Sequence, residues 1–401
     1  MMRKSELLAP AGDWTALHAA VQNGCDAIYF GVDTLNMLAM ADDFHLGLLP
    51  EIRLVCRSSR RQVRNCLTLN TIIYDDELAK AEEVIRAARG DVDAVIAWDP
   101  AVIMLCRDYD VTVHISTQAS VSNARSASYY RGLGAARINL ARECTLEEIE
   151  RIRRVSGVPV ETFIHGAMCV SVSGRCFLSQ FADGKSANRG ECLQHCRREY
   201  LLSDPSAPHV ELTMGDRYVM SAKDLCTMPF IDRLIAVGID AFKIEGRGKS
   251  PDYVATTTRC YRRAIDAAAA GKLDKQLKSD LFGELKKVFN RGFCDGFYFG
   301  RPVAEFTDAY GSKTEQEKVF VGFVTNYFKQ PGVMEVDIRD QSFRTGDELL
   351  VVGGATGAVK FEVSEIRCAN QPVDTAGKGI ATVRCPHRVR ENNKVYRLRP
   401  V

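Results

Sequence analysis

The chain has 401 residues, of which 46% are apolar, and a formal net charge of +2 at pH 7. This length and composition allow a full hydrophobic core and suggest two or three domains. The apolar runs are too short for a membrane helix, which needs roughly 18 consecutive apolar residues, and the small net charge excludes a uniformly basic surface.

The N-terminal sequence and the cysteine content both point to the cytoplasm. The segment MMRKSELLAPAGDW enters a short strand pattern at once and has no apolar stretch of the kind found in signal peptides. The chain contains fourteen cysteines, and disulfides rarely persist in a reducing cytosol. We therefore expect a cytoplasmic protein without membrane contact, whose cysteines are buried thiols or metal ligands.

The first 265 residues alternate between short β-rich apolar runs and amphipathic stretches typical of helices. The expected strands are ELLAP, DAIYFG, CLTLNTI, DAVIAW, VTVHIS, ARINLA, VETFIH and AFKIEG. Eight strands in this rhythm predict a closed (β/α)8 barrel of the TIM type. A doubly wound α/β sheet is the alternative, but AGDWTAL after the first strand lacks the glycine-rich phosphate loop usual in such folds.

Two segments interrupt this rhythm, and the C-terminal part differs from both. Residues 36–64 show no clear period, and residues 166 to about 226 form a cysteine-rich insertion of the irregular kind that usually carries function. After a helical pattern at 251–290, alternating runs predict a small all-β barrel or sandwich, and they are VFVGFV, VMEVDI, DELLVVG, VKFEVSEI and GIATVRC. We expect a barrel domain over residues 1–312 and a β-barrel domain over 313–401.

Polar residues recur after the expected strands, where the loops of such a barrel build the active site. They are Asn70, Thr71, Asp99, Ser116, Thr117, Gln118, Arg142, Glu245 and Arg247. Each alone is equally well explained as a turn or cap residue, but their recurrence at one face favours a shared site. Two arginine clusters are either RNA contacts or solvated helix faces, and their members are Arg53, Arg57, Arg60, Arg61, Arg64, Arg259, Arg262 and Arg263.

The insertion and the segment after it carry five cysteines, which are Cys169, Cys176, Cys192, Cys196 and Cys226. Cys169 and Cys176 stand seven positions apart, wider than the pairs of most zinc sites. Glycine-bearing irregular backbone lets peptide N–H groups reach the sulfur atoms of a cluster. The pattern therefore favours an iron-sulfur cluster over zinc and over independent buried thiols, whereas the other nine cysteines resemble small core residues.

His165 precedes Cys169 and suggests a Cys–His nucleophilic pair as an alternative, with Ser171 or Ser173 as other nucleophiles. Such a pair is defined by spatial geometry and by a third orienting group, which a sequence does not show. A thiolate bound to iron is also not free to attack a substrate. A peptidase mechanism is therefore the second hypothesis, and a structural or supporting role is expected for His165.

Several long segments together resemble the collagenase-like peptidase family U32, and they are ELLAPAGDWTALHAAVQNGCDAIYFG, HISTQASVSN, ETFIHGAMCVSVSGRC, SANRGECLQHCRREY, MSAKDL and FKIEGRGKSPDYV. The resemblance covers nearly the whole chain and is closest to the tRNA hydroxylation branch. It implies a 4Fe-4S cluster and oxygen-independent formation of 5-hydroxyuridine at the wobble position, with prephenate as a candidate oxygen donor. Hydroxylation of another RNA or of a ubiquinone precursor is the alternative within the family.

The resemblance also implies ligands and partners. Cys169, Cys176 and Cys192 match three cluster ligands, and Cys226 is the expected fourth, with Cys196 as the alternative. The polar lining of the site would come from Gln118, Arg142, Glu245 and Arg247, with His165 as a further candidate. The implied partners are the anticodon loop of a tRNA, whose wobble base is already unstacked, and a second protein subunit. NMLAMADDF stands where the family has an arginine-containing segment, which leaves the choice of substrate open.

Overall fold

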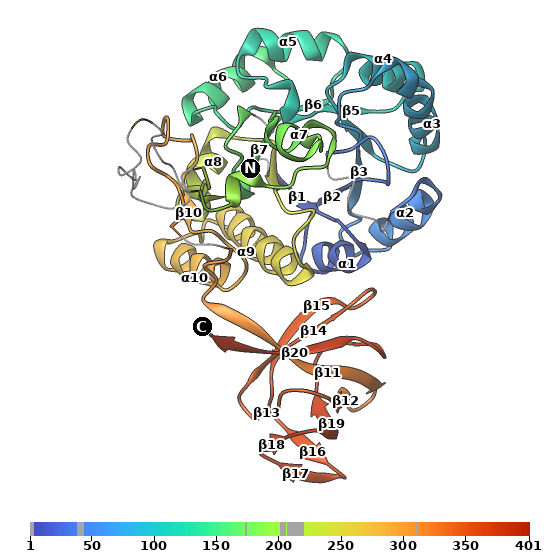
Figure 1. Ribbon diagram of the computed structural model, residues 1–401, viewed down its shortest axis with the longest axis vertical. Coiled ribbons are helices and arrows are strands. Elements are labelled where there is room, and N and C mark those ends of the chain that lie inside the picture. Colours follow the sequence, from blue (N-terminus) through green and yellow to red (C-terminus); the bar gives the residue numbers. More distant parts are fainter. Residues whose placement is uncertain (1–3, 38–43, 173–174, 201–205, 207–219, 309–310) are drawn as a thin grey trace.

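The computed structural model describes residues 4–37, 44–172, 175–200, 206, 220–308 and 311–401. It contains a body of helices around a barrel and a smaller body of β-strands beside it (Figure 1). Ser173 and most of the segment NMLAMADDF lie outside the described residues. None of the helices in the described part of the chain has the length and apolar character needed to span a lipid bilayer.

Eight parallel strands form the closed barrel that the sequence predicts. They are β1 (Glu6–Pro10), β2 (Ala27–Phe30), β3 (Arg64–Thr68), β4 (Ala94–Ala97), β5 (Val113–Ile115), β6 (Arg137–Asn139), β7 (Val160–Ala167) and β9 (Ala241–Ile244). Neighbouring strands pair in sequence order, and β9 pairs with both β7 and β1, which closes the ring. All eight expected strands are thus present, and the predicted fold class is confirmed.

Helices cover the outside of the barrel, as the amphipathic stretches predict. They are α1 (Trp14–Gln22), α2 (Leu49–Arg57), α3 (Leu78–Ala88), α4 (Pro100–Asp108), α5 (Ala124–Gly132), α6 (Leu146–Ser156), α8 (Ile231–Val237), α9 (Pro251–Ala269) and α10 (Lys275–Lys286). Helix α6 shows why such stretches fold locally. Thr145 and Glu148 form a reciprocal capping box at its start, and Gly157 ends it with φ of +65°.

The segment without a clear period contains α2. Pro50 stands in the first turn of this helix, and Leu49, Ile52 and Cys56 are buried at helical spacing. The positions between hold Pro50, Glu51, Arg53, Leu54 and Val55, and because Leu54 is apolar but 65% exposed, the pattern does not separate a buried from a solvated face. A period of this kind is short and therefore difficult to recognise from sequence.

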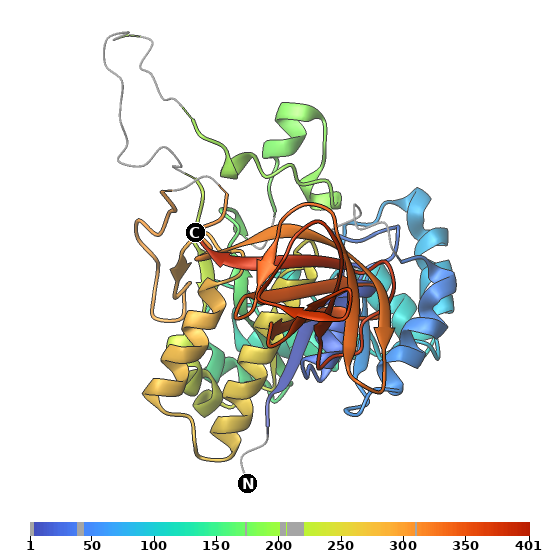
Figure 2. The same cartoon turned by 90° about the horizontal axis from the view of Figure 1, so that it is seen from below.

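The insertion leaves the barrel after β7 and returns before α8. It contains α7 (Leu178–Asp183) and ends in the short strand β8 (Asp224–Cys226), which runs antiparallel to β7 and also pairs with β10 (Phe293–Cys294). Figure 2 shows α7 standing clear of the barrel at the end opposite the N-terminus. This is the end where the barrel strands finish, so the insertion lies over the barrel mouth.

The interior of the barrel is ionic along its axis. The ammonium of Lys243 lies 3.3 Å from the carboxylate of Glu161, which is 3.4 Å from the guanidinium of Arg137. Arg137 in turn lies 2.6 Å from Glu6, and Glu6 also pairs with Arg64. We call these five residues the axial ion chain. They take positions that branched apolar side chains usually fill in such a barrel, and a separate small apolar cluster on the same strands consists of Leu8, Ala27, Tyr29, Cys66, Ala94 and Ile96.

The C-terminal body consists of antiparallel sheets with a core of their own. The eight-stranded sheet contains β11 (Gln316–Phe328), β12 (Val333–Ile338), β14 (Glu348–Gly353), β15 (Gly357–Glu362), β16 (Ile366–Cys368), β17 (Gln371–Val373), β19 (Gly379–Arg384) and β20 (Lys394–Pro400), and a two-stranded sheet contains β13 (Phe343–Arg344) and β18 (Thr375–Ala376). The run VKFEVSEI spans parts of two strands rather than one, because the chain turns at residues 363–365.

The two bodies pack directly against each other. Strand β15 lies on α1, and Leu350 and Leu398 from the C-terminal body join the hydrophobic core of the barrel. Gly357 has φ of +69°, and a Cβ atom there would lie 2.9 Å from the backbone nitrogen of Ala19. Only glycine therefore fits this contact without strain.

Candidate functional site

A cavity of about 300 Å³ opens at the carboxyl ends of the barrel strands. Its lining includes seven of the nine polar residues expected there, namely Asn70, Ser116, Thr117, Gln118, Arg142, Glu245 and Arg247. Thr71 is buried outside this lining. Asp99 instead caps α4, because its carboxylate accepts a hydrogen bond of 2.9 Å from the backbone N–H of Ala101.

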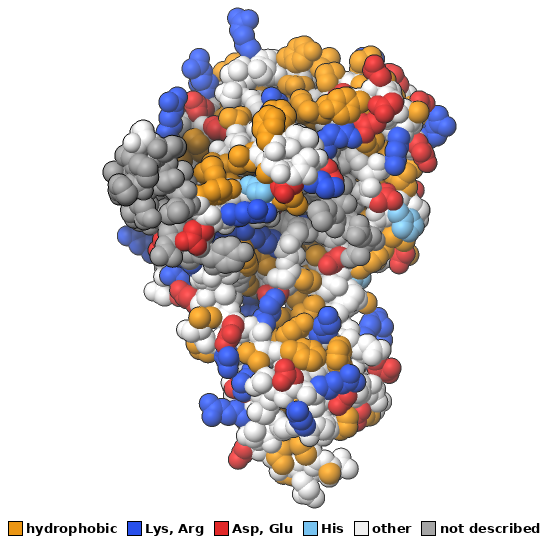
Figure 3. Space-filling model, in the orientation of Figure 1, with side chains coloured by type: hydrophobic (Ala, Val, Ile, Leu, Met, Phe, Trp, Pro, Cys, Tyr) orange, Lys and Arg blue, Asp and Glu red, His pale blue; other side chains and the backbone are white. Residues whose placement is uncertain are grey.

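The cavity is strongly electropositive. Among the described residues that line it, one is a carboxylate, Glu245, and six are cations, namely Arg142, Arg197, Lys243, Arg247, Lys249 and Arg291. Figure 3 shows basic side chains near the middle of this face. Low-dielectric walls strengthen the field of such a cluster, so the cavity favours an anionic ligand.

Two of these arginines are oriented by neutral groups that leave their charge uncompensated. The guanidinium of Arg247 donates hydrogen bonds to Asn36 Oδ1 at 3.0 Å and to Thr68 Oγ1 at 2.8 Å. The guanidinium of Arg142 donates to the carbonyl oxygen of Ala167 at 3.0 Å and lies over the ring of Phe163. These contacts fix both side chains in place before any ligand arrives.

Lys249 is buried beside an aromatic ring. Its ammonium lies 3.4 Å from the ring centroid of Phe289. The pKa of Lys249 is lowered to about 8, chiefly by burial and in part by Arg291, while Glu245 and Asp224 act in the opposite direction. Lys249 is therefore charged at neutral pH but loses its proton at mildly alkaline pH.

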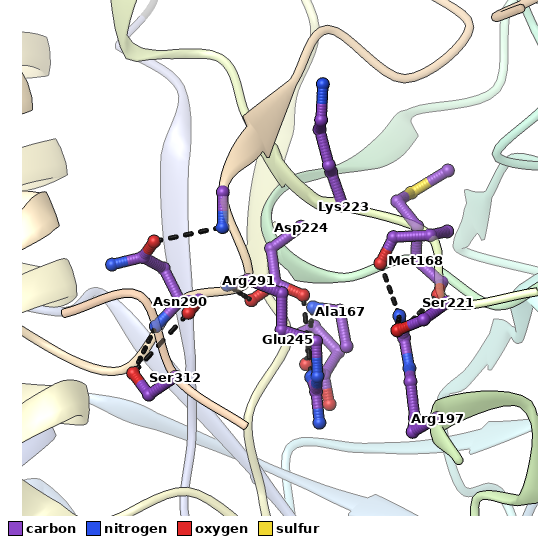
Figure 4. A network of polar contacts seen from close by, with 12 residues as sticks. Ala167, Met168, Arg197, Ser221, Lys223, Asp224, Glu245, Asn290, Arg291 and Ser312 are labelled. Atoms are coloured by element: carbon purple, nitrogen blue, oxygen red, sulfur yellow. Dashed lines mark hydrogen bonds and ion pairs between the residues drawn. The ribbon is translucent and has the colours of Figure 1, made fainter. Parts of the chain in front are cut away.

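Figure 4 shows how the cavity wall is assembled from three parts of the chain. The carboxylate of Glu245 accepts a hydrogen bond of 2.9 Å from the backbone N–H of Ala167. Gly166 precedes this contact with φ of +110°, and a Cβ atom there would lie 2.8 Å from the side chain of Glu245. Arg291 forms an ion pair of 3.6 Å with Asp224 on β8, which joins the segment after α10 to the insertion.

Four cavity cations were not predicted from the sequence. Lys243 carried a signal, because a lysine in the middle of the apolar strand AFKIEG must point into the barrel. Lys249 lies in the segment after the last barrel strand, but Glu245 and Arg247 were the residues of that segment predicted to line the site. Arg197 and Arg291 carried no signal, because they come from an irregular insertion and from a turn far along the chain.

Four cysteines of the insertion lie near one another at the edge of this cavity. Cys169, Cys192 and Cys196 line it. Burial raises the pKa of the Cys196 thiol, and Cys169, Cys192 and Cys176 raise it further through their charges, although Arg197 opposes them. The structure therefore places Cys196 in the electrostatic neighbourhood of the other three.

Arg197 explains how two of these cysteines are held together. Its guanidinium donates hydrogen bonds to the carbonyl oxygen of Met168 at 2.6 Å and to Ser221 Oγ at 3.1 Å (Figure 4). Arg197 directly follows Cys196, and Met168 directly precedes Cys169. The arginine thus joins the backbone beside one cysteine to the backbone beside the other.

Two backbone N–H groups point at sulfur atoms of these cysteines. The N–H of Ser171 lies 3.4 Å from Cys169 Sγ, and the N–H of Leu178 lies 3.4 Å from Cys176 Sγ. Backbone N–H groups aimed at sulfur are typical of cluster sites. Within the described ranges no group of three or more metal-binding side chains is placed closely enough to hold a metal ion.

Cys226, the fourth ligand expected from the resemblance, has a different environment. It pairs with His165 in the β7–β8 ladder and is buried in the barrel core. Its sulfur lies 3.7 Å from Tyr261 Oη, and burial raises the pKa of its thiol to about 12. The nearest charges that act on it belong to Cys260 and Asp295.

His165 is enclosed by aromatic rings and does not line the cavity. Its ring centroid lies 5.5–5.8 Å from the rings of Tyr253, Tyr261 and Phe293, and its Nδ1 is 3.3 Å from Tyr261 Oη. Burial lowers the pKa of His165 to about 3. The imidazole is therefore neutral at physiological pH and packs as part of the core.

The arginine clusters lie away from the mouth. Arg57 and Arg64 form ion pairs with Asp93 and Glu6 near the start of the barrel strands. Arg262 pairs with Asp26 at 2.7 Å in the same region, and Arg259 pairs with Glu284 at 3.4 Å. These four arginines are therefore paired with carboxylates in the structure.

The comparisons with known proteins agree with this architecture. The model of "Peptidase family U32" matches residues 12–308. The chain is 39% identical over 407 residues to a protein named "Collagenase" from Porphyromonas gingivalis, covering 98% of this chain and 97% of the other. It is 34% identical over 359 residues to "tRNA hydroxylation protein P1" of Bacillus subtilis, covering 88% and 84%. It is also 34% identical over 303 residues to a 23S rRNA 5-hydroxycytidine synthase of Escherichia coli, covering 74% of this chain and 45% of that protein. The chain therefore belongs to peptidase family U32.

Proposed function

We propose that this protein is an RNA hydroxylase, which converts uridine to 5-hydroxyuridine at the wobble position of a tRNA without molecular oxygen. The observation that carries the proposal is the electropositive cavity at the barrel mouth, whose lining includes the thiols of Cys169, Cys192 and Cys196. The names of two relatives, a tRNA hydroxylation protein and an rRNA hydroxycytidine synthase, support RNA as the substrate class. A polyanion suits a cavity lined by six cations and one carboxylate.

The geometry suggests how the substrate would be held. An enzyme that alters a base must reach it outside the stack, and an anticodon loop presents its wobble base unpaired. Asn70 and Gln118 offer amide groups for the edge of such a base, and Arg142 and Arg247 offer fixed positive charge for phosphate or carboxylate. A cavity of about 300 Å³ has room for a base but not for a base-paired stem, so only an unpaired nucleotide would enter.

The same charges suit an anionic oxygen donor. Hydroxylation replaces the C5 hydrogen of uracil by a hydroxyl group and removes two electrons from the base. The donor must therefore supply the oxygen atom, while the two electrons pass to an external electron acceptor, such as an oxidised redox protein, and the C5 proton passes to water. Prephenate, a small dianion with two carboxylates, is our candidate, because about 300 Å³ of space between several cations fits a ligand of this size.

We further propose that Cys169, Cys176, Cys192 and Cys196 hold a 4Fe-4S cluster, with Cys226 as the alternative fourth ligand. When bound, such a cluster would supply electron transfer at the cavity edge. The role of the protein there is to hold the ligand loop against the barrel. Arg197 does this through the carbonyl group of Met168.

The test is anaerobic purification of the full chain, followed by iron and sulfide analysis and by nucleoside analysis of tRNA incubated with prephenate. We expect about four irons and four sulfides per chain and formation of 5-hydroxyuridine. Cys169→Ser and Cys196→Ser should lose both, whereas Cys226→Ser should keep the iron. Cys106→Ser, a matched change in the core of α4, should also keep it.

Two outcomes would contradict this proposal. An iron-free wild-type chain, or a Cys169→Ser variant with its full iron content, would remove the cluster from the site. Loss of iron in Cys226→Ser with retention in Cys196→Ser would instead assign the fourth ligand to Cys226. A loaded protein that leaves every tested tRNA unmodified, alone and with a cell extract that supplies a second subunit, would exclude tRNA as the substrate.

A peptidase is the second candidate, because a relative of the same length is named "Collagenase". It predicts cleavage of gelatin by the iron-free protein. The enclosure of His165 in an aromatic cage argues against a pair formed with Cys169, since the imidazole is not exposed at the cavity. Cleavage that survives removal of iron but not Cys169→Ser would favour this candidate.

A further inference from the structure

Two aromatic rings of the insertion are exposed above the barrel mouth. Phe177 is 60% exposed and Phe181 is 86% exposed, and their ring centroids lie 6.0 Å apart. Helix α7, which carries Phe181, stands clear of the barrel on the side of the cavity (Figure 2). We call these two rings the aromatic platform. Exposure of large apolar rings works against folding and usually marks a binding surface.

The platform is held at a fixed place relative to the cavity. Arg175, two residues before Phe177, donates a hydrogen bond to the backbone carbonyl of Gln118 in the cavity wall and lies over the ring of Trp98. On the other side of α7, Arg189 donates to the carbonyl of Ile72 at 2.7 Å. Both ends of the segment that carries the platform are therefore anchored to loops after barrel strands.

The surroundings of the platform favour a polyanion over a protein or a lipid. The adjoining cavity is lined by six cations and one carboxylate, whereas beside the platform Arg189 pairs with Glu77 and Lys185 pairs with Glu191. Exposed rings among positive charges are typical of proteins that bind single-stranded nucleic acid, because bases stack on the rings while phosphates contact the cations. Two rings alone also offer much less area than a stable protein interface needs.

We propose that Phe177 and Phe181 stack on unpaired bases of the RNA next to the nucleotide that enters the cavity. This inference rests on the proposed RNA substrate and names the part of the RNA that is recognised. The platform holds the flanking bases of a single-stranded loop, while the cations draw in its backbone. A fully paired duplex offers no free base faces and does not use the platform.

The test is fluorescence anisotropy of the full chain, purified anaerobically, with two labelled RNAs. One is a hairpin with an unpaired, uridine-containing loop, and the other is a duplex of similar length. Loss of one stacked base weakens binding about 5- to 150-fold, so we expect this effect for Phe181→Ala and Phe177→Ala with the hairpin and none with the duplex. Phe181→Tyr retains a ring and should bind like the wild type. Phe328→Ala, which removes a 40% exposed ring from the C-terminal body, is the matched control.

The salt dependence separates stacking from charge. Phe181→Ala removes no charge, so the slope of log affinity against log salt should equal that of the wild type. Hairpin binding by Phe177→Ala and Phe181→Ala at wild-type strength would overturn the inference and leave the RNA substrate intact. Failure of the wild type to bind the hairpin would overturn the proposed function as well. A variant that binds RNA normally but loses self-association in sedimentation would show that the platform is a protein interface.

Discussion

Replacing Glu161 by glutamine is expected to destabilise the barrel by about 3–5 kcal/mol. Glu161 is 2% exposed and serves two buried cations, with Lys243 at 3.3 Å and Arg137 at 3.4 Å. Glutamine preserves the size of the side chain but removes its charge, so Lys243 loses its ion pair and Arg137 keeps only Glu6. Domains are stable by roughly 5–15 kcal/mol, so this loss would be a large fraction of the total.

Urea unfolding followed by circular dichroism measures this effect, with the signal of the barrel helices as the readout. The double variant Glu161→Gln/Lys243→Met removes one of the unpaired cations and should regain part of the loss. Glu82→Gln, which removes an exposed partner of Arg86, should leave the midpoint unchanged. Wild-type stability of Glu161→Gln would refute the idea that the axial ion chain depends on its central carboxylate.

Three further predictions concern a cation, a histidine and a glycine. Sulfate binding to the mouth cavity should weaken as pH rises through about 8, because Lys249 then loses its proton, and titration calorimetry of Lys249→Met should show a flatter profile. The pKa of His165 is about 3 in the folded state against 6.5 when unfolded. The packing of the neutral imidazole therefore contributes its full stabilisation above pH 6.5, and this contribution falls by about 1.4 kcal/mol per pH unit as pH falls toward 3. In urea unfolding, the stability of His165→Gln should therefore decrease less steeply than that of the wild type as pH is lowered from 6.5 to 3. An unchanged dependence of stability on pH would contradict the assignment. Gly357→Ala should loosen the contact with α1 and lower the free energy of unfolding by about 1 kcal/mol or more. Limited proteolysis should then cleave the chain between the two bodies faster than in the wild type. In Gly354→Ala the added methyl group meets no neighbour, so this variant should behave as the wild type.

Much of the barrel could be predicted from the sequence because its strands are buried on both sides. The run AVIAW, for example, is continuous and apolar, and the polar residues that follow such runs mark the mouth. Gln118, Arg142, Glu245 and Arg247 were placed at one site on this basis, and the cavity contains all four.

The rest depends on contacts between distant parts of the chain. Strand β8 has three residues and pairs with β7, and strand β10 has two residues and pairs with β8. Because both strands form only through these pairings, no local sequence pattern predicts them. The hydrogen bond from Arg197 to the carbonyl oxygen of Met168, which places Cys196 near Cys169, was equally invisible in the sequence. Strand β20, by contrast, has a period-2 signal in KVYRLRP, although it is not among the strands predicted above.

The axial ion chain also bears on the order in which the barrel can be completed. Its members come from β1, β3, β6, β7 and β9, so Glu6 is made first and Lys243 last during synthesis. Until β9 is synthesised, these charges on the inner face of the incomplete sheet remain solvated by water. That part of the incomplete barrel therefore exposes charged rather than apolar surface to neighbouring chains. Closure then brings these charges into the ion pairs of the folded barrel, and β9 completes the ring because it pairs with both β7 and β1.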